Sequence, residues 1–116
     1  MPDSEFEKLI PFNLVKDLPY TSNAIVVKHV LKDKSGFIQA MAFDFGKVHK
    51  GDFSPFPTYI QIIEGKAELV IEDQPTYLHK GDSIIIPPNT DHSFEANQQF
   101  KLIRIVLKSG REDLVQ

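Results

Sequence analysis

The chain has no cysteine among its 116 residues. Cysteine forms disulfides, acts as a thiolate nucleophile and supplies the sulfur ligands of structural zinc sites. All three roles are therefore excluded. Hydrophobic residues make up 41% of the sequence, which is enough for one modest core.

Long apolar runs and clusters of one charge sign are also missing. Nowhere do about 18 apolar residues follow one another, as a membrane-spanning helix requires. The 13 basic and 16 acidic residues are scattered and give a net charge of −3, so no nucleic-acid surface is expected. The opening "MPDSEFEKLIPF" carries acidic residues and does not match a signal peptide. We expect a soluble, cytoplasmic protein that binds neither membranes nor nucleic acid.

Short strands at regular spacing dominate the sequence, and no window of a dozen residues shows a sustained helical stripe. The expected strands are 24–31, 37–45, 58–63, 67–71, 76–78, 83–86, 92–96 and 100–107. Credible turns separate them, including "DKSG", "EGK", "EDQP" and "PPNTD", whereas residues 46–57 are expected to form an irregular loop. This pattern predicts an all-β antiparallel sandwich or barrel.

No repeat or low-complexity linker divides the chain. Residues 1–20 are mixed in character and are interrupted by Pro11 and Pro19, so we expect an N-terminal arm with a short strand or helical turn. A single barrel domain is expected at 21–110, followed by a C-terminal tail at 111–116.

The stretch "GKVHKGDFSPFPTYIQIIEG" has an informative spacing. Five residues separate Gly46 from Asp52, and Ser54 follows two positions later. Three more residues lead to Thr58, and six more lead to Gly65. This order resembles the first motif of the cupin superfamily, whose members are small jelly-roll barrels. In that motif the three middle positions hold histidine, histidine and glutamate.

A second stretch matches the second cupin motif. Gly81 begins it, Pro87 follows at the right distance, and Asn89 stands where the family has glycine. Asparagine is the residue best able to replace glycine in a left-handed conformation. His92 takes the histidine position and Ala96 the asparagine position. The resemblance implies a cupin jelly-roll fold like that of small single-domain members, many of which have no established activity.

The resemblance also raises the question of a metal, because cupins typically hold iron, manganese, nickel or zinc at these positions. Here the positions hold Asp52, Ser54, Thr58 and His92. Neutral hydroxyls are poor ligands for such ions, and tight zinc sites use three or four good ligands. We predict no metal cofactor. The alternative is a trio of His49, Asp52 and His92, although a loop histidine such as His49 is more often solvated.

His92 is the main candidate for chemistry. In "HSFEA" the alternation places His92, Phe94 and Ala96 on one face, which we expect to be internal. His92 is then either a buried histidine with a structural hydrogen bond or a general base. In the second case Asp52 would raise its pKa and fix its tautomer. Metal-free cupin epimerases and isomerases are similar in pairing histidine with a carboxylate or tyrosine. No role is assigned to His29 or His79.

Strand periodicity adds apolar residues to this predicted pocket. Ile60 and Ile62 share a face with Thr58, while Met41 should line the opposite wall with Gln39. Phe56, which lies between two prolines, is expected to lie on the loop at the barrel mouth. The predicted pocket residues are Met41, Phe43, Asp52, Ser54, Phe56, Thr58, Ile60, His92 and Phe94. Core packing is the alternative for each apolar member.

Assembly is indicated by strands that are apolar on both faces. In "KLIRIVL", Leu102 and Val106 alternate with Ile103, Ile105 and Leu107. Such strands are usually covered on both sides, and the sequence offers no obvious helix as cover. We therefore predict a homodimer, as is common among small cupins.

Four functions remain open, and the sequence does not decide whether the protein is an enzyme. The preferred hypothesis is a barrel that binds a small organic molecule without metal, as a sensor or carrier. The alternatives are a metal-independent isomerase, epimerase or lyase that uses His92 with Asp52, a metal-dependent enzyme built on the His49 trio, and a dimerising scaffold. Fold alone does not choose among them.

Overall fold

The computed structural model describes residues 4–108, apart from the surroundings of Gly51 and the Asp52 side chain. One short helix, α1 (Leu14–Asp17), precedes eight strands. These are β1 (Ile25–Asp33), β2 (Gly36–Phe43), β3 (Val48–Asp52), β4 (Thr58–Ile71), β5 (Gln74–His79), β6 (Ser83–Ile86), β7 (His92–Glu95) and β8 (Phe100–Leu107). The predicted all-β class is confirmed. The predicted tail, residues 111–116, lies outside the described residues.

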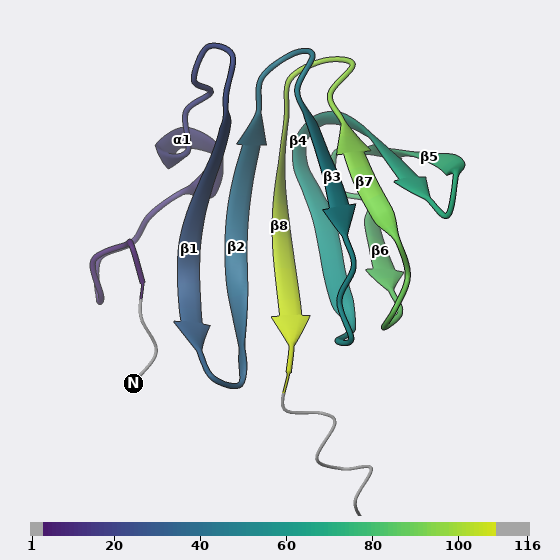
Figure 1. The fold of residues 1–116 in the computed structure, drawn as a ribbon. Helices are drawn as coiled ribbons and strands as arrows, with labels where there is room; N and C mark the ends of the chain where they lie inside the picture. Colours follow the sequence, from purple (N-terminus) through teal and green to yellow (C-terminus); the bar gives the residue numbers. More distant parts are fainter. Residues whose placement is uncertain (1–3, 109–116) are drawn as a thin grey trace, which may run out of the picture.

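The strands form one curled antiparallel sheet with two halves joined through β4 (Figure 1). In the first half, here called sheet A, the order is β1, β2, β8, β4 and β6. In the second half, sheet B, β4 lies between β5 and β7, and β7 pairs with β3. Residues 58–65 of β4 therefore belong to sheet A and residues 66–71 to sheet B. This is the jelly-roll arrangement expected from the motif spacing.

Gly65 marks the place where β4 changes sheets. The predicted "EGK" turn is wrong, because β4 runs without interruption from Thr58 to Ile71. A register shift occurs instead between Ile62 and Glu64, and Gly65 has φ +78°. Glycine reaches such angles without steric cost, so the chain bends here while still pairing with its neighbours.

Strand β3 was also missed. Residues 48–52 are mostly polar and were predicted to be part of a loop. They form a strand because Val48 and His49 pair with Glu95 and Phe94 of β7. A short polar strand of this kind depends on its partner rather than on its own β propensity.

The space between the two halves is filled by an apolar core. Thr58, Ile60 and Ile62 are buried, as the alternation predicted, and His92, Phe94 and Ala96 are buried from the facing strand. Aromatic rings occupy the middle of this core, where the ring centroids of Phe43 and Phe100 lie 4.4 Å apart. The barrel is therefore packed solid at this level.

A second, smaller core lies on the outside of sheet A. There the N-terminal segment buries Leu18 against Ala40 and Ala42 of β2. Lys101, only 5% exposed, donates to the carbonyl oxygen of Val15 in α1. These contacts fix the N-terminal segment on the outer face of β1 and β2.

The same segment carries Tyr20, whose hydroxyl donates to a carboxylate oxygen of Glu64 at 2.7 Å. The Nζ atom of Lys101 lies 3.4 Å from that oxygen and 4.7 Å from the Tyr20 ring centroid. Burial, together with the Glu64 carboxylate, raises the pKa of Tyr20. The hydrogen bond from Tyr20 lowers the pKa of Glu64.

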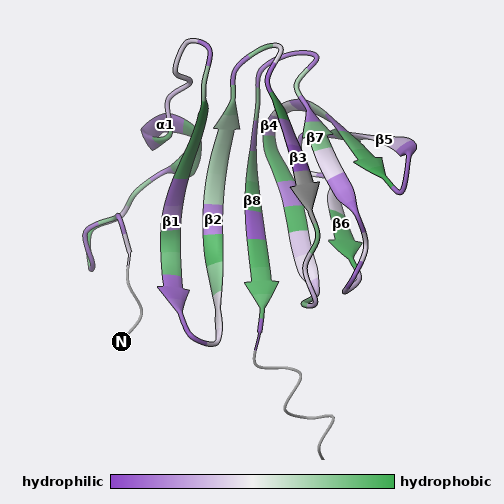
Figure 2. Cartoon of the chain, viewed as in Figure 1, coloured by the Kyte–Doolittle hydropathy of each residue, from purple (hydrophilic) through white to green (hydrophobic). Residues whose placement is uncertain are grey.

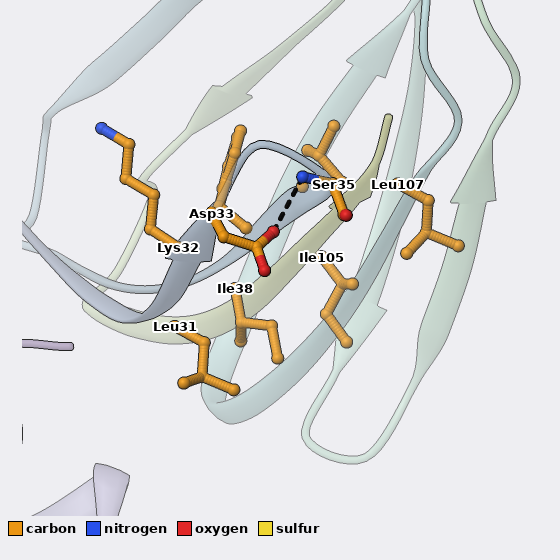
Figure 3. A pocket seen from close by; sticks show the side chains of 10 residues that line it. Leu31, Lys32, Asp33, Ser35, Ile38, Ile105 and Leu107 are labelled. Carbon is orange, nitrogen blue, oxygen red and sulfur yellow. Dashed lines mark hydrogen bonds between the residues drawn. The ribbon is translucent and has the colours of Figure 1, made fainter. Parts of the chain in front are cut away.

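The rest of the outer face of sheet A carries a row of apolar side chains in register. We call this the outer row. It consists of Leu31, Ile38, Ile105, Tyr59 and Ile85, each opposite the next on adjacent strands. In Figure 2 the strands of this sheet are hydrophobic over much of their length. At the end formed by the β1–β2 turn, the row borders an apolar groove of about 210 Å³ (Figure 3).

No helix within residues 4–108 is both long enough and apolar enough to cross a membrane.

Candidate ligand-binding site

A cavity of about 340 Å³ lies at one end of the barrel, and we call it the mouth cavity. Its walls come from β2, β4, β7 and β8, the connection before β4, and the residue after β8. The lining residues are Phe37, Phe53, Ser54, Pro55, Phe56, Thr58, His92, Arg104, Val106 and Lys108. Hydroxyl, imidazole and cationic groups thus share one hollow with three aromatic rings.

Four predicted pocket residues meet in this cavity. Ser54 and Phe56 come from the connection before β4, Thr58 from the start of β4 and His92 from β7. The α-carbon of Asp52 pairs with that of His92 in the β3–β7 ladder. The backbone of Asp52 is thus next to His92, whereas its side chain lies outside the described part of the structure.

The other predicted pocket residues lie deeper. Met41, Phe43, Ile60 and Phe94 are fully buried in the core and do not line the cavity. The rings of Phe43 and Phe94, with centroids 5.6 Å apart, help to fill the barrel below the mouth. Periodicity located their inward face correctly but could not show how far the core extends.

His92 is oriented by a hydrogen bond to the backbone. It is 4% exposed, and its Nδ1 lies 3.1 Å from the carbonyl oxygen of Thr90. A carbonyl oxygen only accepts, so Nδ1 carries the proton and Nε2 is the basic nitrogen of the neutral ring. The ring also meets Phe94 edge to face, with centroids 6.0 Å apart. This orientation suits both a structural histidine and a proton acceptor.

Ser54 connects the two loops that carry the motifs. Its carbonyl oxygen accepts a 2.6 Å hydrogen bond from the backbone N–H of Asn89. Asn89 has φ +61°, the left-handed conformation expected from its place in the motif. The hydroxyl of Ser54 accepts from the backbone N–H of Phe56 at 3.1 Å and keeps its own hydrogen for donation. The loop geometry therefore fixes a hydroxyl donor in the cavity wall.

Arg104 is the main site residue that the sequence analysis missed. It lies in β8, where its α-carbon is opposite Gln39 on one side and the buried Ile60 on the other. Directly opposite residues share a face, so Arg104 points to the inside of the barrel. The available signal was its place on the same face as Leu102 and Val106, where a lone charged residue is unusual.

His49 is placed differently from the expectation of a solvated loop residue. It lies in β3 opposite Phe94, and the two ring centroids are 6.3 Å apart. Its side chain is half-buried. His49 and His92 thus contact the same phenylalanine ring, so the alternative trio with Asp52 has two members in one neighbourhood.

The donor set of the mouth cavity does not fit the metal of a typical cupin. Ser54 and Thr58 supply neutral hydroxyls where that site needs imidazole and carboxylate groups. Within the described residues, no group of three histidine or carboxylate side chains is placed to hold an ion. The hydroxyls are better suited to hydrogen bonding with an organic ligand.

Comparison with known proteins agrees with this fold. A comparison with curated proteins gives no match. A conserved protein of unknown function from Streptococcus pyogenes has a TM-score of 0.83 at 19% identity, covering 89% of this chain and 90% of that one. A cupin superfamily protein from Desulfitobacterium hafniense has a TM-score of 0.81 at 20% identity, covering 87% and 93%. An RmlC-like cupin from Shewanella frigidimarina has a TM-score of 0.68 at 17% identity, covering 77% and 80%.

At these identities the structural similarity shows the fold alone. The family assignment comes from the sequence model of the cupin domain, which matches residues 48–106. That match covers half of the chain and contains every residue of β3 through β7 and most of β8. The chain therefore belongs to the cupin family.

Proposed function

We propose that this cupin binds a small organic molecule in the mouth cavity without the help of a metal ion, as a sensor or carrier. The observation that carries the proposal is the cavity itself, which lies where the motif residues Ser54, Thr58 and His92 converge. Its volume of about 340 Å³ falls in the range of small-molecule sites, roughly 300–1,000 Å³.

The lining of the cavity supports this proposal. Phe37, Phe53 and Phe56 supply apolar contact area, while Ser54 and Thr58 supply hydroxyls at the same wall. A hollow that combines apolar walls with convergent polar groups is a usual form of a ligand site. The packed core beneath limits the ligand to the mouth and therefore to a small molecule.

An enzyme remains the second candidate, because one observation favours it. The hydrogen bond from His92 to Thr90 leaves Nε2 as the basic nitrogen, and Asp52 is its backbone neighbour. This arrangement supports an isomerase, epimerase or lyase with His92 as the base. NMR titration of His92 in the wild type and in Asp52→Asn tests it. If the two proteins have the same His92 pKa, the acid–base pair does not exist.

The binding proposal is tested by screening neutral and charged fragments with two-dimensional amide NMR. We expect fragments to shift the amide signals of Thr58 and His92. In Thr58→Val, which keeps the shape but removes the hydroxyl, affinity should fall by about fivefold, as expected for one lost hydrogen bond. The control is Thr76→Val in β5, which should leave affinity unchanged. Shifts confined to the outer groove beside Leu31 would contradict the proposal.

A further inference from the structure

We propose that the ligand of the mouth cavity is a small organic acid whose carboxylate is bound by Arg104, with Gln39 and His29 acting as positioning residues. This inference rests on the function proposed above and adds the chemical class of the ligand. It begins from a chain of polar contacts that runs across the inner face of sheet A.

The first link of this chain is the contact between Arg104 and Gln39. Nε and Nη2 of Arg104 lie 3.2 and 2.7 Å from the same oxygen, Oε1 of Gln39. A guanidinium group only donates, so the oxygen of the Gln39 amide must face it. Because the guanidinium is planar, a partner that bonds both nitrogens fixes the plane of the whole group.

The second link runs from Gln39 to His29. Nε2 of Gln39 lies 3.2 Å from Nε2 of His29 on the neighbouring strand. The amide oxygen is turned to Arg104, so the amide NH₂ group donates to His29. The imidazole Nε2 is then the acceptor, which puts the ring proton on Nδ1.

The last link is Glu5 in the N-terminal segment. One carboxylate oxygen of Glu5 accepts from the backbone N–H of His29 at 2.8 Å and lies 3.5 Å from Nδ1. The protonated Nδ1 therefore faces a carboxylate. The three contacts, from Arg104 to Gln39, from Gln39 to His29 and from His29 to Glu5, all donate in the same direction. The orientation of Arg104 therefore depends on residues of β8, β2, β1 and the N-terminal segment.

Arg104 connects this series of contacts to the mouth cavity. Its side chain is half-buried and lines the mouth cavity beside Thr58 and Val106. A partly desolvated and pre-oriented guanidinium binds planar carboxylates more strongly than a flexible surface cation does. Lys108 also lines the cavity, with Nζ 5.5 Å from the Phe37 ring centroid, and adds a second positive charge.

The remaining walls indicate the body of the acid. Phe37, Phe53 and Phe56 present aromatic surface, and Ser54 and Thr58 present hydroxyls. An acid with a flat or apolar body would place its carboxylate at Arg104 and its body against the rings. Benzoate has this form, and benzamide is its uncharged counterpart of nearly the same shape. The pair therefore isolates the contribution of the charge.

The test is titration of the full chain with benzoate and benzamide, followed by amide NMR. We expect benzoate to bind about tenfold more tightly than benzamide, as a charge-assisted contact allows. In Arg104→Gln this preference should be lost. Arg104→Lys should keep part of it, because lysine retains the positive charge but lacks the planar pair of donors. Gln39→Leu should weaken benzoate binding and leave benzamide unchanged, which a purely structural role would not do. Lys66→Gln, which removes an exposed cation on sheet B, is the control and should bind like the wild type.

If benzoate and benzamide shift the amide signals of Thr58 and His92 with equal affinities, an organic acid is excluded as the ligand class. The cavity would still be a binding site. A benzoate preference that survives both Arg104 variants would exclude Arg104 as the binding residue. If neither probe shifts the cavity residues, this inference is overturned, whereas the proposed function is overturned only if the fragment screen also gives no shifts at Thr58 and His92.

Discussion

The α-carbon of Gly65 lies against the carbonyl oxygen of Gln99, so close that an added Cβ atom would collide with that oxygen. Gly65 lies in β4 and pairs with Phe100 of β8, and Gln99 immediately precedes Phe100 in the connection from β7. Two demands thus meet at one residue. The backbone needs φ +78°, and the neighbouring strand leaves no room for a side chain.

We predict that Gly65→Ala destabilises the protein much more than Gly46→Ala does. Gly46 also has a positive φ, +85°, but no atom lies within 4 Å of its added Cβ. Gly46→Ala should cost about 1–2 kcal/mol through backbone strain alone, whereas Gly65→Ala adds displacement of β8. Urea denaturation measures both free energies of unfolding. If both substitutions lower the free energy of unfolding equally, the contact with the Gln99 carbonyl does not contribute to the destabilisation.

A second prediction concerns pH. The hydrogen bond from Tyr20 lowers the pKa of Glu64 from its ordinary value of 4.5. A carboxylate with a lowered folded-state pKa stabilises the fold above about pH 4.5, and this stability is lost as the pH falls through the folded-state pKa. The wild type should therefore lose stability on acidification more steeply than Glu64→Gln.

Tyr20→Phe serves as the partner variant, because it removes the donor while keeping the ring over Lys101. Its stability should therefore fall less steeply than that of the wild type as the pH is lowered. Urea midpoints measured at pH 7 and at successive values down to pH 3 give the comparison. Parallel curves for all three proteins would contradict the assignment of the interaction to Glu64.

A third prediction addresses metals directly. Elemental analysis of protein purified without chelators should find no stoichiometric iron, manganese, nickel or zinc. Added Mn²⁺, Fe²⁺, Ni²⁺ or Zn²⁺ should not raise Tm, because a ligand that does not bind the folded state cannot stabilise it. Metal that is bound stoichiometrically and lost in both His49→Ala and His92→Ala would instead support the trio with Asp52.

A fourth prediction concerns assembly. We propose that the outer row of sheet A binds a second copy of the chain, since its side chains form one apolar band across β1, β2, β8, β4 and β6. Light scattering at micromolar concentration should give twice the chain mass. Ile85→Lys, at a residue 69% exposed in the row, should yield a monomer.

Tyr77→Lys is the matched control for that experiment. Tyr77 is 53% exposed on β5, in sheet B, and does not belong to the row. This variant should stay dimeric. A monomeric wild type, or equal effects of the two substitutions, would refute the outer row as the interface.

Much of the fold could be predicted because local signals and tertiary structure agree. The alternation of β7 placed His92 and Phe94 inside, and the spacing of the glycines located the motif loops. Strand β3 was not predicted, for a physical reason. Its polar residues form a strand only by pairing with β7, and a partner distant in sequence leaves no mark on the local pattern.

The site was predictable only in part. Ser54, Thr58 and His92 stand at motif positions, so their convergence follows from the family spacing. Arg104 enters through the register of β8 with β2 and β4, which no window of sequence contains. The contact from Glu5 to His29 likewise joins residues from the N-terminal segment and β1, and only the folded chain brings them together.

The passage of β4 through both halves of the barrel has a consequence for how the protein opens. This strand pairs with β8 and β6 in sheet A up to Gly65 and with β5 and β7 in sheet B beyond it. The two halves cannot separate from each other without breaking hydrogen bonds along this shared strand, whereas β1 and β3 can leave the sheet without disturbing it. Local opening should therefore be confined to the edges, and the amides of β4 should exchange with solvent only through global unfolding. A ligand at the mouth, next to Thr58 at the start of β4, would then slow exchange as far away as Ile71.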